Sequence, residues 1–244
     1  MKETKIYGKI PVKNALVGRR RGTLLYLNGE HPDQELQSLA SKNNVRVKLV
    51  SNRKLDSLSD NSNHQGAVLI AEDFEYSTLD ECLSRVSSKD ESTVVILDGI
   101  EDPVNFGSII RSSAAFGVDF IVIGKNRQVK VTPTVTKIST GAENYVPIAE
   151  ETNLSQSMET LKKNGYWVVC SAGEGKDAYD EIDYSGKIAL VIGSEGKGAS
   201  RLVKERSDFV ASIPMNASVS ALNASVACAV FLTEINSYRR KHSK

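Results

Sequence analysis

The stretch from Lys187 to Glu234 constrains the fold of this chain more than any other. It begins with an uninterrupted apolar run, Ile188–Ile192, which leads directly into a glycine-rich turn, Gly193–Gly198. A continuous β-branched run bounded by glycines is typical of a strand buried on both faces, as in a parallel sheet. Ligands of open α/β sheets bind beyond the carboxyl ends of the strands, so we expect Glu195 in a pocket.

A long helix is predicted to follow this strand region, from about Val219. Apolar residues recur there at helical spacing on two faces, and a helix that is apolar on most sides is buried on most sides. Asn223, in its first turns, would then be a polar group in a dry environment that needs a partner. Two interpretations remain open: its amide belongs to a satisfied structural network, or it faces a ligand in the same pocket as Glu195.

Length and composition describe an ordinary globular protein. The chain has 244 residues, of which 40% are hydrophobic and 25% charged, which is enough for one large or two small domains. It has no apolar run long enough to span a membrane, and its start is too polar for a signal peptide, so we expect a cytoplasmic protein. The cysteines and histidines are scattered, which predicts buried free thiols and no metal site; they are Cys82, Cys170, Cys228, His31, His64 and His242.

Basic residues cluster locally although the formal net charge is only +1. The clusters are Arg19–Arg21, Lys125–Lys130 and Arg239–Lys244. Each alone is more often a solvated surface than a phosphate contact. The three together favour a polyanionic partner.

The pattern of predicted elements divides the chain into two α/β units. Helices and strands alternate from Pro11 to Ala71. Polar residues without periodicity follow, interrupted by one weak helix around Leu79–Val86. We therefore predict a small domain over residues 1–74, a linker over 75–91 and a second domain over 92–244. Alternating strands and helices in the second domain predict a mostly parallel sheet with helices on both faces.

Two nucleotide-binding motifs fit in part. Gly193–Ser200 has the outer spacing of a P-loop, but Ala199 stands where the lysine is needed. Gly173–Ala178 matches the dinucleotide motif G-x-G-x-x-A, with Glu195 about twenty residues later. The segment between them, Tyr179–Gly186, is too short and too polar for a crossover helix. A dinucleotide-dependent oxidoreductase is therefore kept as one alternative function of this chain.

A helix predicted from about Pro103 to Phe116 carries two candidate site residues, Asn105 and Arg111. They are six residues apart, so they lie on different faces of one helix. An arginine in an otherwise apolar helix needs a carboxylate or a phosphate. The partner is either a phosphate of a ligand or, in a structural salt bridge, the carboxylate of Glu101 or Glu195.

Three motifs together identify a family. They are Asn105-x-Gly107-x-x-x-Arg111, Gly193-Ser-Glu195-Gly196-x-Gly198, and Ile213-Pro-Met215 continuing into Leu222-Asn223-x-Ser225-Val-Ala227. In their order and spacing the chain resembles the SpoU (TrmH) class of SPOUT RNA 2′-O-ribose methyltransferases over nearly its whole length.

The amino-terminal region adds a second resemblance. Its Gly8-x-x-Pro11-Val12 and His64-Gln65-Gly66 are similar to the ribosomal-protein-like RNA-binding domain of the ribosomal-RNA members. This favours ribosomal over transfer RNA and implies that His64 and Gln65 contact RNA. Arg19, Arg20 and Arg21 are expected to contact the RNA backbone.

The resemblance implies a deep trefoil knot in the carboxy-terminal domain, S-adenosylmethionine as the methyl donor, and a homodimer formed through that domain. Gly193, Ile213 and Leu222 would contact the donor. The residues around the reacting atoms would be Asn105, Arg111, Glu195 and Asn223. The implied reaction is methylation of a ribose 2′-hydroxyl in 23S ribosomal RNA, at a guanosine.

Two positions depart from the family pattern. Ala221 stands where the family usually has serine, and Ala217 where it usually has glycine. Because Ala221 lacks the serine hydroxyl, the resemblance alone does not predict the methylation rate or the positioning of the substrate. Alternatives are therefore a methyltransferase for transfer RNA or for antibiotic resistance, and a catalytically weakened RNA-binding protein of ribosome assembly.

Overall fold

The computed structural model describes residues 3–18, 20–216 and 221–242. Contacts divide the chain into two compact units. The amino-terminal unit comprises Met1–Glu75 with Lys130–Tyr145, and the carboxy-terminal unit comprises Tyr76–Val129 with Val146–Lys244. Among the described residues, every helix is too short or too polar to cross a membrane.

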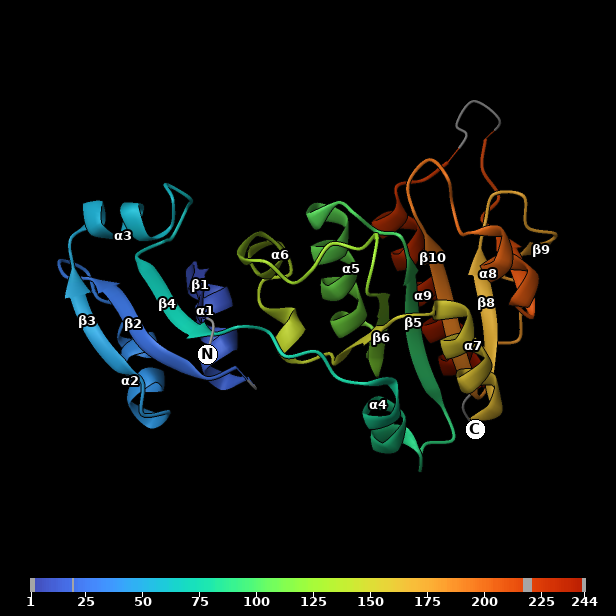
Figure 1. Ribbon diagram of the computed structural model, residues 1–244, viewed down its shortest axis with the longest axis horizontal. Coiled ribbons are helices and arrows are strands. Elements are labelled where there is room, and N and C mark those ends of the chain that lie inside the picture. Colours follow the sequence, from blue (N-terminus) through green and yellow to red (C-terminus); the bar gives the residue numbers. More distant parts are fainter. Residues whose placement is uncertain (1–2, 19, 217–220, 243–244) are drawn as a thin grey trace. The chain divides into compact units, whose positions relative to one another are not determined.

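The amino-terminal unit contains a four-stranded sheet with helices packed on it (Figure 1). In chain order its elements are β1 (Glu3–Tyr7), α1 (Lys9–Val17), β2 (Gly22–Asn28), α2 (Gln34–Lys42), β3 (Arg46–Val50), α3 (Asn52–Leu58), β4 (Ala67–Glu72), α6 (Pro133–Ile138) and the 3-10 turn Ala142–Asn144. The strand order is β1-β4-β2-β3, with β2 and β3 parallel and the other pairs antiparallel. The core lies between the sheet and α1 and α2, where Leu25, Leu27 and Leu69 meet Val12 and Leu36.

Strand β1 was absent from the sequence prediction. Its residues Glu3, Thr4 and Lys5 are polar, and only Ile6 is fully buried. The strand exists because it pairs along its whole length with the buried strand β4, which a local pattern does not reveal.

The carboxy-terminal unit contains a seven-stranded parallel sheet, which confirms the predicted architecture (Figure 1). Its elements are α4 (Leu79–Val86), β5 (Ser92–Asp98), α5 (Pro103–Ala115), β6 (Phe120–Gly124), β7 (Ile148–Glu151), α7 (Leu154–Lys163), β8 (Tyr166–Ser171), β9 (Asp177–Ala178), β10 (Lys187–Gly193), α8 (Arg201–Arg206), β11 (Phe209–Ser212) and α9 (Ala224–His242). The strand order is β7-β6-β5-β10-β8-β11-β9. One core cluster joins the sheet to α4, α7 and α8, while α5 and α9 pack on each other.

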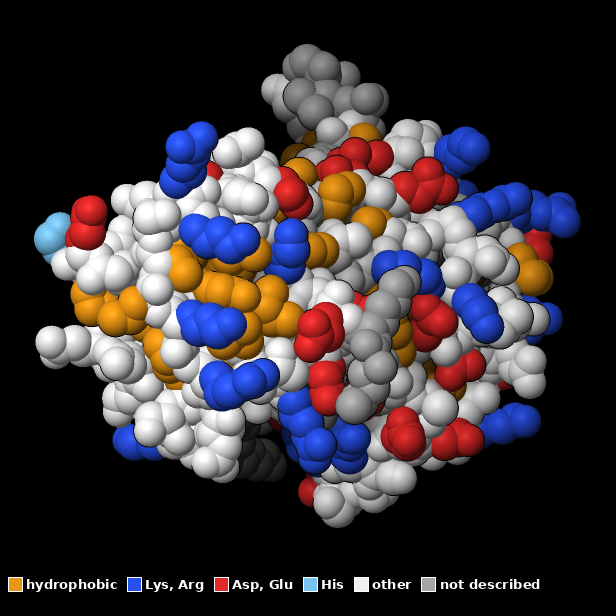
Figure 2. Space-filling view, turned by 60° about the vertical axis from the view of Figure 1, so that its left-hand side comes forward, with side chains coloured by type: hydrophobic (Ala, Val, Ile, Leu, Met, Phe, Trp, Pro, Cys, Tyr) orange, Lys and Arg blue, Asp and Glu red, His pale blue; other side chains and the backbone are white. Residues whose placement is uncertain are grey.

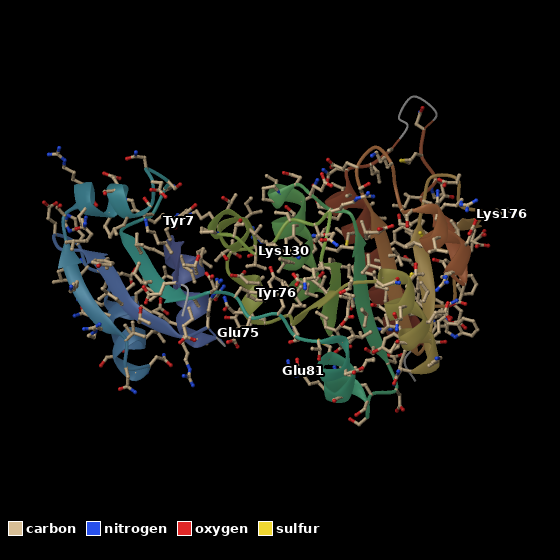
Figure 3. All side chains as sticks on the ribbon, in the orientation of Figure 1. Tyr7, Glu75, Tyr76, Glu81, Lys130 and Lys176 are labelled. Carbon is tan, nitrogen blue, oxygen red and sulfur yellow. The ribbon has the colours of Figure 1, made fainter. Side chains whose placement is uncertain are left out.

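The predicted linker, residues 75–91, contains a packed helix. Thr78 and Glu81, the latter labelled in Figure 3, form a capping box at the start of α4. Leu79, Cys82 and Val86 are buried in the core of the carboxy-terminal unit. The flanking residues are polar, but the amphipathic face of the helix packs on the sheet, so this segment is not a free connection.

The three cysteines are free and buried, as predicted. Burial raises the pKa of the Cys170 thiol to about 12 and that of the Cys228 thiol likewise to about 12. All three lie in the carboxy-terminal unit.

Candidate active site

The glycine-rich turn after β10 is closed on itself. Ser194 and Gly198 exchange two backbone hydrogen bonds of 3.1 and 2.8 Å. A Cβ atom on Gly193 would lie 2.0 Å from the Ala199 nitrogen, so a side chain at position 193 would break the turn. The turn therefore holds Glu195 at its tip, at the carboxyl end of the central strand.

Three side chains from distant segments meet at this turn. The Asn223 amide nitrogen donates to Glu195 Oε1 at 2.6 Å and to Asn105 Oδ1 at 2.8 Å. The Asn223 Oδ1 atom accepts from the backbone nitrogens of Ser225 and Val226, at 2.9 and 3.3 Å. Because this oxygen caps α9, the amide nitrogen of Asn223 must point to the other two side chains.

The cap also explains why α9 begins at Ala224 and not near Val219. Asn223 precedes the first turn and is exposed, so the prediction that it lies inside a buried helix is wrong. Val226, 47% exposed, likewise lies on an open face of the helix. Residues 217–220, which include Ala217, lie outside the described residues.

Asn105 is oriented by the same network. It is only 3% exposed and lies in the first turn of α5, where Asp102 caps the helix by accepting from the Asn105 backbone nitrogen at 3.0 Å. Its Oδ1 atom faces Asn223, so its amide nitrogen points elsewhere. That nitrogen makes no hydrogen bond to any residue that the structure describes.

A first cavity of about 510 Å³ lies on one side of the turn. The cavity is lined by all three residues that were predicted to bind the methyl donor, Gly193, Ile213 and Leu222. Ala221 also lines it. Apolar side chains, including Ile192 and Met215, form much of its wall, while backbone of the glycine turn forms the rest. These walls suit S-adenosylmethionine: they offer apolar surface for the adenosyl group, backbone for its polar atoms, and the carboxylates of Glu174 and Glu195 for its ammonium.

A second cavity of about 490 Å³ adjoins the first. Asn105 lines only this second cavity, whereas Glu195 and its neighbours Ser194, Lys197 and Gly198 line both. Glu195 therefore lies between two adjoining spaces, of which the second is lined by more charged side chains than the first. A donor in the first and an acceptor in the second would meet at its carboxylate.

Arg111 is not part of this cluster. It lies on α5, is exposed, and lines neither cavity. Among the described residues it has no hydrogen bond or ion pair, so the alternative of a salt bridge to Glu101 or Glu195 is not realised. Its guanidinium is available to a group outside this chain.

The arginines of the predicted basic clusters differ in exposure and in their partners. The Arg20 side chain is 6% exposed and lies 3.6 Å from the fully buried Glu143 carboxylate. It also donates to the Glu72 carbonyl at 3.2 Å, so its charge is used inside the amino-terminal unit, and an RNA contact of Arg20 stays a prediction. Arg239 similarly donates to the Gly186 carbonyl at 2.8 Å. Arg21 is exposed, and Arg19 lies outside the described residues.

His64 and Gln65 shape the loop before β4. His64 Nδ1 accepts from the Gly66 nitrogen at 2.9 Å, and its Nε2 lies 3.1 Å from Asp56 Oδ1. Gln65 is exposed, has a positive φ of 51° and accepts from the Lys9 nitrogen at 3.1 Å. His64 is thus held internally, while Gln65 remains accessible.

Exposed basic side chains are nevertheless numerous. On the face drawn in Figure 2, lysine and arginine side chains surround a patch of hydrophobic side chains, and elsewhere on that face basic and acidic groups alternate. Such a surface can contact a phosphate backbone locally although the net charge is close to zero.

Comparisons with known proteins show the family of this chain. Residues 92–233 match the SpoU rRNA methylase family, and residues 5–77 match the substrate-binding domain of RNA 2′-O ribose methyltransferases. A putative TrmH family tRNA/rRNA methyltransferase of Staphylococcus saprophyticus is 44% identical, with 96% of each chain covered. The 23S rRNA (guanosine-2′-O-)-methyltransferase RlmB of Coxiella burnetii is 42% identical, over 96% of this chain and 95% of that protein.

Solved structures share the fold. The SpoU methyltransferase AviRb from Streptomyces viridochromogenes, in complex with AdoMet, has a TM-score of 0.84 at 22% identity and covers 99% of this chain and 92% of its own. An AdoMet-bound rRNA methyltransferase from Sinorhizobium meliloti has a TM-score of 0.82 at 23% identity and covers 99% and 88%.

Fold, site and comparisons define an enzyme that transfers methyl groups from S-adenosylmethionine to RNA ribose. The chain belongs to the SpoU methylase family.

Proposed function

We propose that this protein methylates the ribose 2′-hydroxyl of a guanosine in 23S ribosomal RNA. The observation that carries the proposal is the Asn105–Asn223–Glu195 cluster at the boundary of two cavities. The 42% identity to a protein named for this reaction supports the substrate. This substrate implies a cytoplasmic location.

The chain's own residues would position the acceptor. S-adenosylmethionine, when bound in the first cavity, supplies the methyl group. Asn223 fixes the Glu195 carboxylate, which can accept a hydrogen bond from a ribose hydroxyl, and the free Asn105 amide can donate to a ribose oxygen. Such alignment lowers the barrier by several kcal/mol, with ~7–11 kcal/mol as a ceiling from intramolecular models.

We assign Arg111 to the phosphate of the target nucleotide. A guanidinium with a pKa above ~12 is a poor proton acceptor at neutral pH. Its planar fork suits a phosphate and stabilises negative charge as the hydroxyl loses its proton. The proton would then pass to that phosphate or to water.

Arg111 lies outside both cavities of its own chain, so we propose that a second copy supplies it in a homodimer. Val104, 53% exposed, and Val226, 47% exposed, lie on α5 and α9, the helices that pack together in this region. Exposed apolar side chains on this pair of helices fit an interface between two copies. The dimer would bring one chain's guanidinium to the other chain's cluster.

Tritium transfer tests the proposed reaction. Total RNA from cells without the gene is incubated with the protein and methyl-labelled S-adenosylmethionine, and the fractions are separated. Label in 2′-O-methylguanosine of 23S rRNA is expected. Label in transfer RNA would favour the alternative substrate, and absence of label with retained RNA binding would favour an assembly protein.

A further inference from the structure

We infer that the second cavity binds the target base and that Glu101 reads it as guanine. This rests on the proposed function, which requires a nucleotide to enter beside Glu195. The cavity of about 490 Å³ is within the range of small-molecule sites, and its lining is polar and charged.

Two loops that are fixed to each other form the walls of this cavity. Gln128 Oε1 accepts from the Ile100 nitrogen at 3.1 Å, and the Val129 nitrogen donates to the Ile100 carbonyl at 2.9 Å. These bonds tie the loop after β6 to the loop between β5 and α5. Arg127, which also lines the cavity, has a positive φ of 54° within this tied loop. The site is therefore preformed on rigid strand ends.

Four carboxylates line the cavity, and three of them are already engaged. Asp98 accepts from the Ser200 nitrogen at 2.7 Å, Asp102 from the Asn105 nitrogen at 3.0 Å, and Glu195 from Asn223 at 2.6 Å. Glu101 has no hydrogen bond or ion pair with any described residue. Its carboxylate is the one with both oxygens available to a ligand.

A second and independent feature points to a ligand in the same space. The Asn105 side chain, 3% exposed, turns an amide nitrogen without a partner among the described residues toward this cavity and away from Asn223. This nitrogen is not among the buried unsatisfied atoms, so it is accessible and can donate to a ligand that enters the cavity. A ribose oxygen beside Glu195 would accept from it, with its base extending toward Glu101.

The chemistry of the free groups selects guanine among the four bases. Its Watson–Crick edge offers two adjacent donors, N1–H and the 2-amino group, which a carboxylate accepts as a pair, and an acceptor at O6. Arg127 and Lys197 line the same cavity, have no hydrogen bond or ion pair with any described residue, and can donate to that acceptor. Adenine and cytosine present a ring acceptor, and uracil a single donor, to the same carboxylate.

The test uses a synthetic RNA fragment around the mapped nucleotide, carrying guanosine, inosine or adenosine at the target position. Inosine lacks only the 2-amino group. Wild-type protein is expected to methylate guanosine about 10- to 100-fold faster than inosine, and Glu101→Gln to reduce that ratio to near one. S-adenosylmethionine affinity should stay unchanged, because Glu101 does not line the first cavity.

Glu181→Gln, an exposed carboxylate that lines neither cavity, is the matched control and should keep the guanosine preference. Equal rates on all three fragments, or an unchanged preference in Glu101→Gln, would overturn base reading while the methyltransferase assignment stands. No methylation of any fragment by wild-type protein would overturn both.

Discussion

Arg20 in the amino-terminal unit and Arg111 in the carboxy-terminal unit were both expected to meet a phosphate, yet their environments in the structure differ. Arg20 is 6% exposed and is surrounded by acceptors of its own unit, with the Glu143 carboxylate 3.6 Å away. Arg111 is exposed and has no partner among the described residues. A buried guanidinium with acceptors of its own unit serves stability, whereas an exposed one without a partner among the described residues is available for a substrate.

The largest expected effect tests the buried member of this comparison. Arg20→Ala leaves the Glu143 carboxylate buried without its cation, so we expect the amino-terminal unit to lose about 3–5 kcal/mol of unfolding free energy. Urea unfolding followed by circular dichroism measures the loss. The cysteines lie only in the carboxy-terminal unit, so labelling of thiols should not begin at the same urea concentration.

Arg21→Ala is the matched control, because Arg21 is exposed and adjacent in sequence. It should leave the unfolding midpoint unchanged and weaken RNA binding slightly, with a shallower dependence on salt. If Arg20→Ala unfolds like wild type, the ion pair contributes nothing and the contrast with Arg111 fails.

Arg111, the exposed arginine of this comparison, should affect the methylation rate and not the stability of the fold. Arg111→Ala is expected to lower the methylation rate by about 10²–10³, as does removal of one transition-state donor in other enzymes, with thermal stability unchanged. Arg111→Lys keeps the charge but loses the planar fork, so it should rescue only part of the rate. A lysine variant as fast as wild type would contradict the phosphate role.

A mixing experiment sharpens the proposal that a partner supplies Arg111. Chains with Arg111→Ala are mixed with chains with Asn223→Ala after unfolding and refolding together. If sites are shared between two copies, one site of each mixed dimer is intact, and the mixture regains up to about a quarter of wild-type activity, since half of the dimers are mixed. Activity no greater than that of the separate variants would place Arg111 in its own chain's site.

The smallest expected effect concerns Ala221, which lines the first cavity. Ala221→Ser restores the hydroxyl common in the family at a solvent-exposed position, so the change in S-adenosylmethionine affinity should stay within about 1 kcal/mol. Calorimetric titration measures it. A rate more than about 100-fold higher in the serine variant would instead identify the natural protein as a weakened enzyme.

The parallel sheet and the location of the cluster could be predicted from the sequence because their signals are local. Ile188–Ile192 is a continuous buried strand, and Gly193 is required by a close backbone approach. Asn105, Glu195 and Asn223 stand at element ends, which is where side chains of an α/β sheet converge. The trefoil knot stays a prediction.

Other features depend on contacts between distant residues, which a sequence pattern does not encode. Arg20 looked like a surface cation because its neighbours are arginines, but Glu143, its partner, lies far along the chain in a segment that packs with the amino-terminal unit. Glu101 was weighed only as an ion-pair partner of Arg111. The cavity that gives it another role is formed by two loops whose proximity appears only in the folded chain.

The most direct test of the central claim is a map of ribose methylation in ribosomal RNA from cells without the gene, complemented with wild-type protein or with Asn223→Ala. One 2′-O-methylguanosine of 23S rRNA should be missing without the gene, return with wild-type protein and remain missing with the variant. An unchanged map without the gene, or full restoration by Asn223→Ala, would contradict the account.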